Sequence, residues 1–511
     1  MVTRILKLQN AMLKNKTPKQ GTFSNTPEAE TVAAGVPPRS GSIDPVEAVR
    51  TIINQVEPVI WDEFLEKHYG NRSLLDKGKS QKDKHYNTVV PIAEHFVRCL
   101  NQNGMGAGLL NATPHFYVCS HWQIINKHNC SILLGELAER LGYNVLAARH
   151  YSFRGELLKQ FHTSLKNIHH IESSERVLIN FGNGTLEVLN GNEKLREFRK
   201  DDALLYKLPF DYDETAICPM FDKYLSRVLA DSASRDVLAE FFGWLFLKDL
   251  KLEKALILFG EGQNGKSVLF DIINTLLGDQ NVTNFNLSSL TKMENRFRLK
   301  TALLNFGSEI NGRCDFDVFK QMASGERIES RRLYNDPEIM CNYARLAFNA
   351  NVLPRDTEQS KGFFRRFLIV PFSETISDAE KDPDLARKII SSELPGVFNW
   401  VMSGLRRLRV TRKFSECLAA EKVLLSYRME SDSVAMFLDE TELHWSLNEK
   451  ITKENLYEAY RKFCLGAKYD SVAKNEFGRR LLRDHHFGES KSGNFRYWHP
   501  PRRDPGVTFA P

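Results

Sequence analysis

The clearest pattern along the chain is an alternation of short apolar runs and segments with helical apolar spacing between residues 251 and 410. Ala255–Phe259 is fully apolar, and Val268–Leu277 carries apolar residues three and four positions apart, which predicts a buried strand followed by a helix. Three further strands are predicted at Ala302–Phe306, Arg345–Phe348 and Phe367–Val370. This alternation is typical of an α/β domain.

The segments before this domain have mostly helical spacing. Val89–Leu100 and Ile132–Leu141 predict helices, and the lysine-rich interruption Asp76–Lys84 predicts an exposed loop. Two apolar stretches flank Gly182-Asn183-Gly184, and because Asn-Gly favours tight turns they predict a hairpin. Val237–Leu247 is apolar on nearly all sides, which predicts a helix buried between domains or subunits.

The last hundred residues predict a small basic module. Thr452–Cys464 reads as an amphipathic helix, and a second, basic helix is expected from an N-cap at Ser471 to Arg483. His485–Tyr497 predicts a hairpin around Ser492-Gly493-Asn494. Two helices and a hairpin suggest a winged-helix-like module whose second helix enters a DNA major groove. A basic adaptor that does not touch DNA is the alternative. The expected DNA contacts on this helix are Lys474, Arg479 and Arg480.

These patterns divide the chain into five parts. Residues 1–44 are rich in Ser, Thr, Pro, Gly and Lys and predict a disordered basic tail. Residues 45–175 predict an α-rich domain without evident primase motifs, and 176–250 a helical collar or linker. Residues 251–410 form the predicted α/β domain, and 411–511 the C-terminal module.

The amino-acid composition excludes few classes of protein. The formal net charge of +6 fits nucleic-acid binding but equally fits an ordinary solvated surface. The eight cysteines include no C-x-x-C pair, so neither a zinc site nor a disulfide framework is expected in a chain of 511 residues. No apolar run approaches the length needed to cross a bilayer. A soluble, cytoplasmic protein without membrane contact is therefore expected.

The strongest chemical signal follows the first strand. Residues 260–267 read Gly-Glu-Gly-Gln-Asn-Gly-Lys-Ser and match G-x-x-x-x-G-K-[ST] between a strand and a helix. The glycines let backbone N–H groups curl around phosphates, the Lys reaches the β- and γ-phosphates, and the Ser hydroxyl ligates Mg²⁺. ATP and Mg²⁺ are thus the expected cofactors. The predicted binding residues are Gly260, Gly262, Asn264, Gly265, Lys266 and Ser267, with Ser267 also a metal ligand.

Four later residues complete the predicted catalytic set. Glu309 follows the second strand and is expected to orient the attacking water and support the metal. Asn351 follows the third strand and is expected to contact the γ-phosphate, although Asn also commonly caps loops. Arg365 and Arg366 precede the fourth strand, where an Arg packs poorly but can reach ATP in an adjacent subunit as an arginine finger.

Taken together, these residues resemble helicase superfamily III, in particular the helicase part of phage and plasmid primase-helicases and poxvirus-type primase-helicases. The resemblance covers about residues 175–500. Its marks are Asn183-Gly184, Leu208-Pro209, Cys218-Pro219, the Gly-Gln-Asn-Gly-Lys-Ser loop, Ser308-Glu309, Ser324-Gly325-Glu326, Arg331-Arg332, Asn351-Val-Leu-Pro354 and Arg365-Arg366 leading to Pro371-Phe372.

The resemblance implies an α/β fold with an AAA+-like P-loop ATPase core that assembles into a ring, expected to be a homo-hexamer. ATP would bind at subunit interfaces and single-stranded DNA would thread the channel. Asn351 is then the sensor, and Arg366 rather than Arg365 the finger. A hairpin between Glu309 and the sensor strand would contact DNA. Its candidate contacts are Lys320, Arg331 and Arg332, for which an ordinary charged loop is the alternative.

Two departures from the family pattern matter. Many superfamily III helicases carry two adjacent acids where this chain has Ser308 and Glu309, so one carboxylate would serve both metal and water. The first 175 residues show neither a polymerase-type nor a zinc-bearing primase pattern, so primase activity is not expected.

The sequence therefore predicts an ATP-dependent replicative DNA helicase of a phage, plasmid or other mobile element. Two alternatives stay open. One is a replication initiator that binds an origin duplex, through the C-terminal module, and recruits a host helicase. The other is a P-loop ATPase for DNA packaging or defence.

Overall fold

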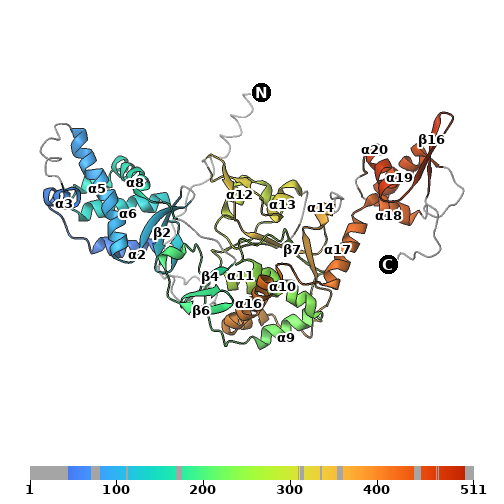
Figure 1. Cartoon of the computed structure of the whole chain (residues 1–511), viewed down its shortest axis with the longest axis horizontal. Helices are drawn as coiled ribbons and strands as arrows, with labels where there is room; N and C mark the ends of the chain where they lie inside the picture. Colours follow the sequence, from blue (N-terminus) through green and yellow to red (C-terminus); the bar gives the residue numbers. More distant parts are fainter. Residues whose placement is uncertain are drawn as a thin grey trace, which may run out of the picture. The chain divides into compact units, whose positions relative to one another are not determined.

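The structure is a computed structural model (Figure 1). It describes residues 44–70, 81–110, 113–168, 175–308, 310, 316–333, 336–353, 361–441, 451–467, 469 and 471–500. The predicted tail, residues 1–44, lies outside this part except for Asp44. In the described part, no helix combines the length and the hydropathy that a membrane crossing requires.

The N-terminal domain combines helices with a small sheet. Its helices are α2 (Pro45–Asn54), α3 (Trp61–Tyr69), α5 (Gln81–Gln102), α6 (Lys127–Arg140), α7 (Val145–Arg149) and α8 (Tyr151–Ser164). Asp44 begins the first of them, since its carboxylate accepts a hydrogen bond of 3.0 Å from Val46 N and Pro45 occupies the first turn. The helices predicted at Val89–Leu100 and Ile132–Leu141 are confirmed within α5 and α6.

One prediction for this domain is wrong in its described part, and one feature was not predicted. The predicted loop Asp76–Lys84 is helical from Gln81 onward, as the start of α5, while residues 76–80 lie outside the described part. An antiparallel sheet was not predicted, yet β1 (Gly106–Leu110), β2 (Thr113–Val118) and β3 (His121–Gln123) pair in that order. Their alternation is weak because two glycines occupy β1 and β3 spans three residues.

The predicted hairpin is confirmed in the segment that follows. β4 (Arg176–Asn180) pairs with β5 (Thr185–Leu189), which pairs with β6 (Asn192–Arg196). At the turn, the Asn183 amide donates to Tyr212 O at 3.0 Å and accepts from Tyr212 N at 2.9 Å. This amide therefore fixes the course of the chain toward the next helices, α9 (Pro219–Val228) and α10 (Ser232–Trp244).

The central domain contains a five-stranded parallel sheet in the order β13-β7-β12-β9-β8. The strands are β7 (Ala255–Phe259), β8 (Val282–Thr283), β9 (Leu304–Gly307), β12 (Arg345–Ala350) and β13 (Phe367–Pro371). Both faces of β7 are buried: Leu256 and Leu258 belong to one core cluster, Ala255 and Ile257 to another. All four strands predicted for this domain are confirmed within one or two residues.

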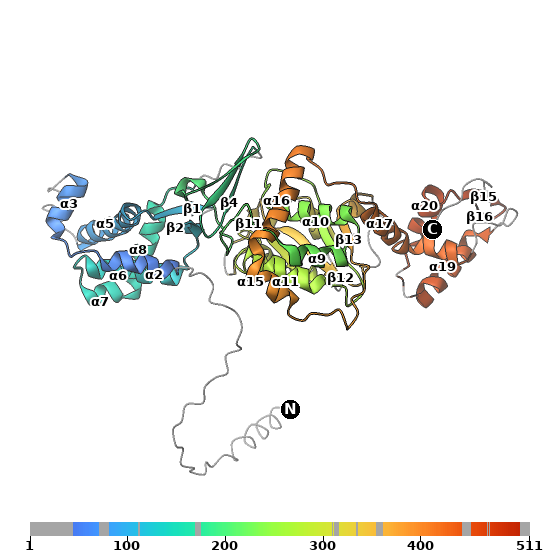
Figure 2. The ribbon, with the colours of Figure 1, turned by 90° about the horizontal axis from the view of Figure 1, so that it is seen from below.

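Helices cover both faces of this sheet, as Figures 1 and 2 show. On one face lie α10, α11 (Lys266–Leu277), α15 (Leu385–Ser392) and α16 (Leu394–Thr411). The other face packs against α13 (Phe316–Ala323), α14 (Lys361–Phe364) and α17 (Leu418–Glu430). A two-stranded hairpin, β10 (Ile328–Ser330) with β11 (Glu338–Met340), and α12 (Met293–Arg298) adjoin this second face.

The C-terminal module has its own core. Its elements follow in the order α18 (Ser433–Glu440), β14 (Ile451–Thr452), α19 (Lys453–Ala467), α20 (Lys474–Arg483), β15 (Gly488–Ser492) and β16 (Phe495–His499). The strands form an antiparallel sheet ordered β14-β16-β15. The predicted hairpin is confirmed. The predicted N-cap is wrong, because α20 begins at Lys474 with Ala473 at the cap. In the described part of the module, α18 precedes the two predicted helices.

Helices α10 and α16 cross at two glycines. A Cβ on Gly404 would lie 2.2 Å from Ala239 O, and one on Gly243 would lie 2.5 Å from Leu405 N. Backbone therefore contacts backbone at this crossing, with no room for a methyl group. The predicted burial of Val237–Leu247 is confirmed, because Phe241, Phe242 and Trp244 are at most 1% exposed.

We expect Gly404→Ala to lower the stability of the central domain by about 1–3 kcal/mol, because the new methyl group forces the two helices apart. Gly466→Ala on α19 is the matched control, since a Cβ there meets no atom within 4 Å. Replacing this helical glycine should raise stability by up to about 1 kcal/mol. Denaturant unfolding measures both, and equal shifts of the two variants would contradict the tight crossing.

Candidate nucleotide-binding site

The loop of residues 260–265 joins β7 to α11 and curls tightly. Gly260 N donates to Ala350 O at 3.1 Å on the neighbouring strand. A side chain at Gly260 would collide, because its Cβ would lie 2.3 Å from Phe372 O and 2.3 Å from Asn264 Nδ2. Gln263 and Gly265 adopt positive φ angles of 61° and 82°. These conformations turn the backbone toward the first turn of α11.

Two polar side chains hold the loop from inside. Asn264, 4% exposed, donates from Nδ2 to Glu261 O at 3.0 Å and to Phe372 O at 3.1 Å. Lys266, 7% exposed, donates from Nζ to Gly260 O at 2.5 Å and to Asn264 Oδ1 at 3.0 Å. Burial lowers the pKa of Lys266 because it disfavours the charged ammonium. The ammonium thus lies inside the loop, where an anion would be its natural partner.

Residues distant in sequence support the loop from outside. The Tyr224 hydroxyl on α9 donates to Gly265 O at 2.8 Å, and Ile376 N donates to Gln263 O at 2.9 Å. Burial raises the pKa of Tyr224, so it stays a donor. Sequence reasoning missed both supports, and the only available signal was the apolar face of the helix that carries Tyr224.

The outer side of the loop faces solvent. Glu261, Gly262 and Gln263 are exposed, and a Cβ on Gly262 would meet no atom within 4 Å. Ser267 is exposed in the first turn of α11, where backbone N–H groups have no intrahelical partner. The loop, the lysine and the helix N-terminus together fit a phosphate chain, and the Ser267 hydroxyl is accessible to a phosphate-bound cation.

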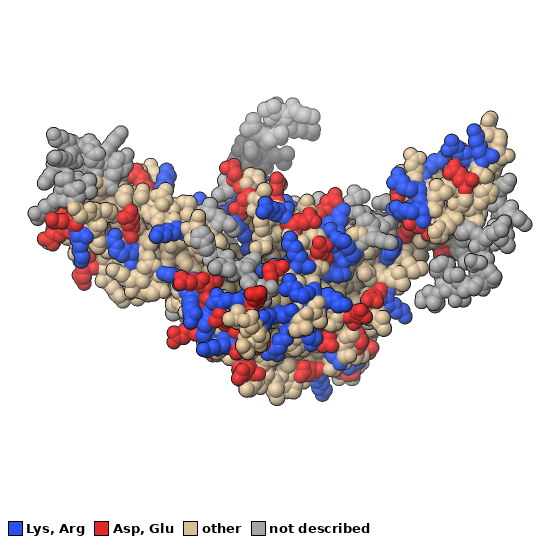
Figure 3. Space-filling model, viewed as in Figure 1, with Lys and Arg blue, Asp and Glu red and all other residues tan. Residues whose placement is uncertain are grey.

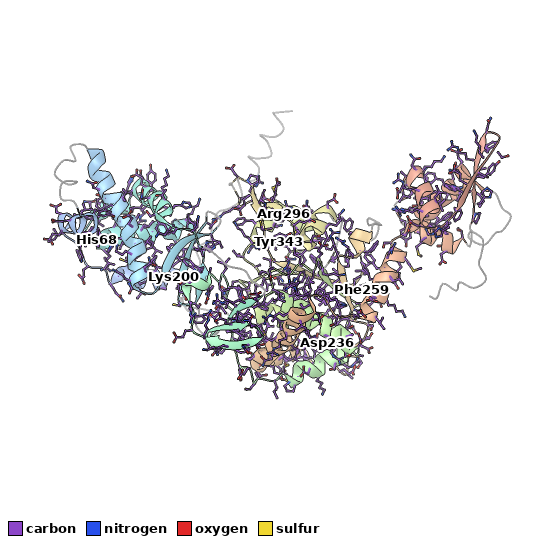
Figure 4. The ribbon with its side chains drawn as sticks, viewed as in Figure 1. His68, Lys200, Asp236, Phe259, Arg296 and Tyr343 are labelled. Atoms are coloured by element: carbon purple, nitrogen blue, oxygen red, sulfur yellow. The ribbon has the colours of Figure 1, made fainter. Side chains whose placement is uncertain are left out.

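The strand register places the other predicted residues around this loop. Ala350 pairs with Phe259 (labelled in Figure 4), so Asn351 is level with Gly260 and is exposed. Phe348 pairs with Gly307, so Ser308, also exposed, ends the next strand along the same edge. Glu309 lies outside the described residues, and its role stays a prediction. In the described part, no group of three or more His, Cys, Asp and Glu side chains is placed to hold a metal ion.

Asn349 is a polar residue of this edge that sequence reasoning passed over. It lies two positions before Asn351, and side chains two apart share one face of a strand. Its Oδ1 is buried without a hydrogen-bond partner in the structure, while its backbone oxygen accepts from Ile310 N at 3.1 Å. Its amide is a second candidate for the sensor position.

The two arginines lie at the amino ends of the strands, whereas the loop lies at the carboxyl ends. Phe367 pairs with Ala255, so Arg366 lies just before β13, and the five residues of β7 separate its level from the loop. Arg366 Nε donates to Ser324 Oγ at 2.8 Å, and Nη1 donates to Gly362 O. Arg365 is exposed and pairs with Glu253 at 2.7 Å. Ser324, one of the family marks, therefore orients Arg366 specifically.

The predicted DNA contacts near the β10–β11 hairpin are already partly paired. Arg331 pairs with Glu294 through Nε at 3.1 Å, and Lys320 pairs with Asp317 at 2.7 Å. Arg332 is half-buried beside Arg331. Arg296 and Tyr343, labelled in Figure 4, anchor the hairpin region: Arg296 donates to Glu329 O at 2.7 Å, and Tyr343 to Glu326 O at 2.9 Å.

The basic residues predicted on α20 divide into two groups. Lys474 and Arg479 are exposed, although each forms a surface ion pair, with Glu454 and Glu476 respectively. Arg480 is 9% exposed and pairs with Asp432 and Glu476 at 3.3 Å. Its charge is matched inside the module, so its place favours a structural role over DNA contact.

Comparison with known proteins finds two matching family models. "D5 N terminal like" matches residues 62–230, and a family of unknown function, DUF5906, matches residues 258–366. The first match supports a relationship to the primase-helicases of phages, which the motifs resemble. The assignment to superfamily III stays a prediction.

Similar solved structures are apo forms of the NrS-1 C terminal region. One is 12% identical, with a TM-score of 0.47, and the match covers 81% of this chain and 99% of that one. Another, the A form, is 14% identical, with a TM-score of 0.48 and coverages of 79% and 98%. At these TM-scores the similarity does not define the fold.

We expect Asn264→Ala to weaken ATP binding at least about tenfold, because the loop loses two backbone hydrogen bonds and the acceptor of Lys266 Nζ, each worth about 1 kcal/mol. Gln263→Asn is the control: Gln263 is exposed, and Asn tolerates its positive φ. Titration with a fluorescent ATP analogue measures both affinities. Unchanged binding by Asn264→Ala would show that the loop does not depend on this amide.

Proposed function

We propose that this chain is an ATP-dependent DNA helicase that works in the replication of a phage, plasmid or other mobile element. The observation that carries the proposal is the loop of residues 260–265, with buried Lys266 inside it and the end of β12 beside it. The match to the D5 N-terminal-like family model supports the same proposal. The absence of primase activity, expected from the sequence, stays a prediction.

In this proposal the loop binds the β- and γ-phosphates of ATP. Lys266 exchanges its hydrogen bonds to Gly260 O and Asn264 Oδ1 for phosphate oxygens, and the loop N–H groups and the α11 N-terminus donate to the same oxygens. Bound Mg²⁺ would neutralise charge on the phosphates. Ser267 and Glu309 would hold it, and Glu309 would also orient the attacking water. Asn351, or Asn349 beside it, would contact the γ-phosphate.

The location of Arg366 supports hydrolysis between two copies of the chain. Five residues of β7 separate its level from the loop, a distance of roughly 16 Å at the usual strand rise. Arg366 is therefore poorly placed for its own chain's ATP. Held by Ser324, it is available at the far edge of the sheet for the ATP of a neighbouring subunit. A ring supplies such neighbours, and we propose a homo-hexamer.

The C-terminal module supports DNA binding. Three helices and a three-stranded antiparallel sheet in the order α18, β14, α19, α20, β15, β16 suit a winged helix, with α20 as the groove-binding helix and β15–β16 as the wing. This module also favours a second candidate, an initiator that binds an origin and recruits a host helicase. Strand displacement on a forked substrate by the purified protein alone separates the two functions.

We expect Lys266→Ala to reduce ATP hydrolysis and unwinding to background, because the phosphates lose their principal cation while the rest of the loop is retained. A coupled ATPase assay and a strand-displacement assay measure the losses, and circular dichroism checks the fold. Steady-state hydrolysis that survives in a well-folded variant would refute the assignment of the site.

Arg366→Ala should bind ATP almost normally but hydrolyse it about 10³–10⁵-fold more slowly, the range known for arginine fingers. Arg365→Ala is the matched control, since Arg365 is exposed and pairs only with Glu253 among the described residues.

Mixing Arg366→Ala with Lys266→Ala tests whether the finger acts between subunits. Some mixed interfaces combine an intact loop on one side with an intact Arg366 on the other, so partial recovery of ATPase activity is expected. A mixture that forms mixed rings, shown by native mass spectrometry, but stays inactive would remove the trans role of Arg366.

A further inference from the structure

The hairpin β15–β16 of the C-terminal module ends in an exposed aromatic ring. Phe495 is 62% exposed and lies opposite Ser492 at the closing pair of the hairpin. Gly493 adopts a φ of 59° in the turn, which lets two residues reverse the chain. The exposed phenyl ring at the tip is available to a partner with an apolar or aromatic surface.

Two cations occupy the pair of the hairpin next to Phe495, with their side chains on the opposite face of the ribbon. Lys491 and Arg496 are opposite each other across the hairpin, and both are exposed. Like charges at directly opposed positions destabilise a strand pair. Glu489, two residues before Lys491 on the same face, lies close enough to attract Arg496, while its own salt bridge is to Lys453. A polyanion lying across the hairpin would remove the remaining repulsion.

The base of the hairpin is firmly packed. Trp498 on β16 is 2% exposed in the module core. Lys453 Nζ lies 4.1 Å from the centre of its ring and pairs with Glu489 on β15 at 2.7 Å. The tip therefore projects from an ordered support, so that little conformational entropy is lost when it binds.

The exposed face of α20 extends the positive surface. Lys474, Arg479 and Arg483 are exposed there, and Figure 3 shows lysine and arginine side chains gathered over one face of this module. A surface of this kind suits phosphates along one stretch of DNA. The aromatic tip adds a different contact, because a phenyl ring carries no hydrogen-bonding group and does not read base edges.

We propose that Phe495 stacks on the first unpaired base at a junction between duplex and single-stranded DNA, while Lys491 and Arg496 contact the flanking phosphates. This inference rests on the proposed function. Inserting a phenyl ring between the stacked bases of an intact duplex requires unstacking them, at a cost of a few kcal/mol per step. An unpaired base presents the face that an aromatic ring needs.

The test uses the full chain without nucleotide and a forked DNA carrying 2-aminopurine at the first unpaired base. The wild-type protein should change the fluorescence of this base on binding, and Phe495→Ala should abolish that change. Phe495→Trp should retain it. Phe495→Ala should also bind the fork about tenfold more weakly, within the range for loss of one base–aromatic stack, and bind a blunt duplex as the wild type does. Leu465→Ala, at an 84% exposed residue of α19, is the matched control.

The contribution of Lys491 and Arg496 to DNA binding is measured separately. Replacing Lys491 and Arg496 by glutamine should reduce the slope of log affinity for the fork against log salt concentration by up to about 2. A Phe495→Ala protein that retains the 2-aminopurine signal, or that weakens for duplex and fork alike, overturns the proposal. Unwinding that still depends on Lys266 would show that only this inference has failed. If the wild-type protein shows no unwinding that depends on Lys266, the proposed function itself has failed.

Discussion

The contact on which the central domain depends is the crossing of α10 and α16 at Gly243 and Gly404. It joins segments about 160 residues apart in sequence, and it brings the helical segment before β7 against the helices that follow β13. Because α9 precedes α10 by a short connection, the crossing also fixes Tyr224, which donates to Gly265 O in the loop. Backbone packing at two glycines thus helps to hold a residue that supports the loop of residues 260–265, which is formed elsewhere in the chain.

A buried charge reinforces the same contact. Glu240 on α10 is fully buried, and its carboxylate accepts from Arg407 Nε at 3.0 Å, Ser415 N at 2.8 Å and Ser415 Oγ at 2.6 Å. Such a group adds little net stability, since its desolvation offsets its attraction, but it penalises any arrangement that leaves it unpaired. Its partners follow or belong to α16, so the ion pair selects one register of the two helices.

How far the sequence predicts this molecule depends on how local each signal is. The strand and helix around Lys266 are defined by residues that are adjacent in the chain. The bounds of the strand are correct, and the helix begins at Lys266, two residues before the predicted Val268. The β1–β3 sheet escaped prediction because glycine and three-residue strands weaken the period-two pattern. The supports of the loop, Tyr224 and Ile376, escaped because their contacts depend on tertiary packing. The N-cap moved from Ser471 to Ala473 for the same reason: Val472 N bonds to the buried Tyr460 hydroxyl, which sets the entry to α20.

The two ends of the sheet have different chemistry, and this separation has a mechanistic consequence. The carboxyl edge holds the loop, Asn349 and Asn351, whereas the amino edge holds Arg365, Arg366 and Lys254. Burial, with a smaller contribution from Arg365, lowers the pKa of Lys254, and Arg365 itself pairs with Glu253. Because the strands are parallel, Arg366 lies at the opposite end of the sheet from the loop of its own chain. Under the proposal that ATP binds at this loop, Arg366 would serve the ATP of a second copy, and hydrolysis would then depend on assembly.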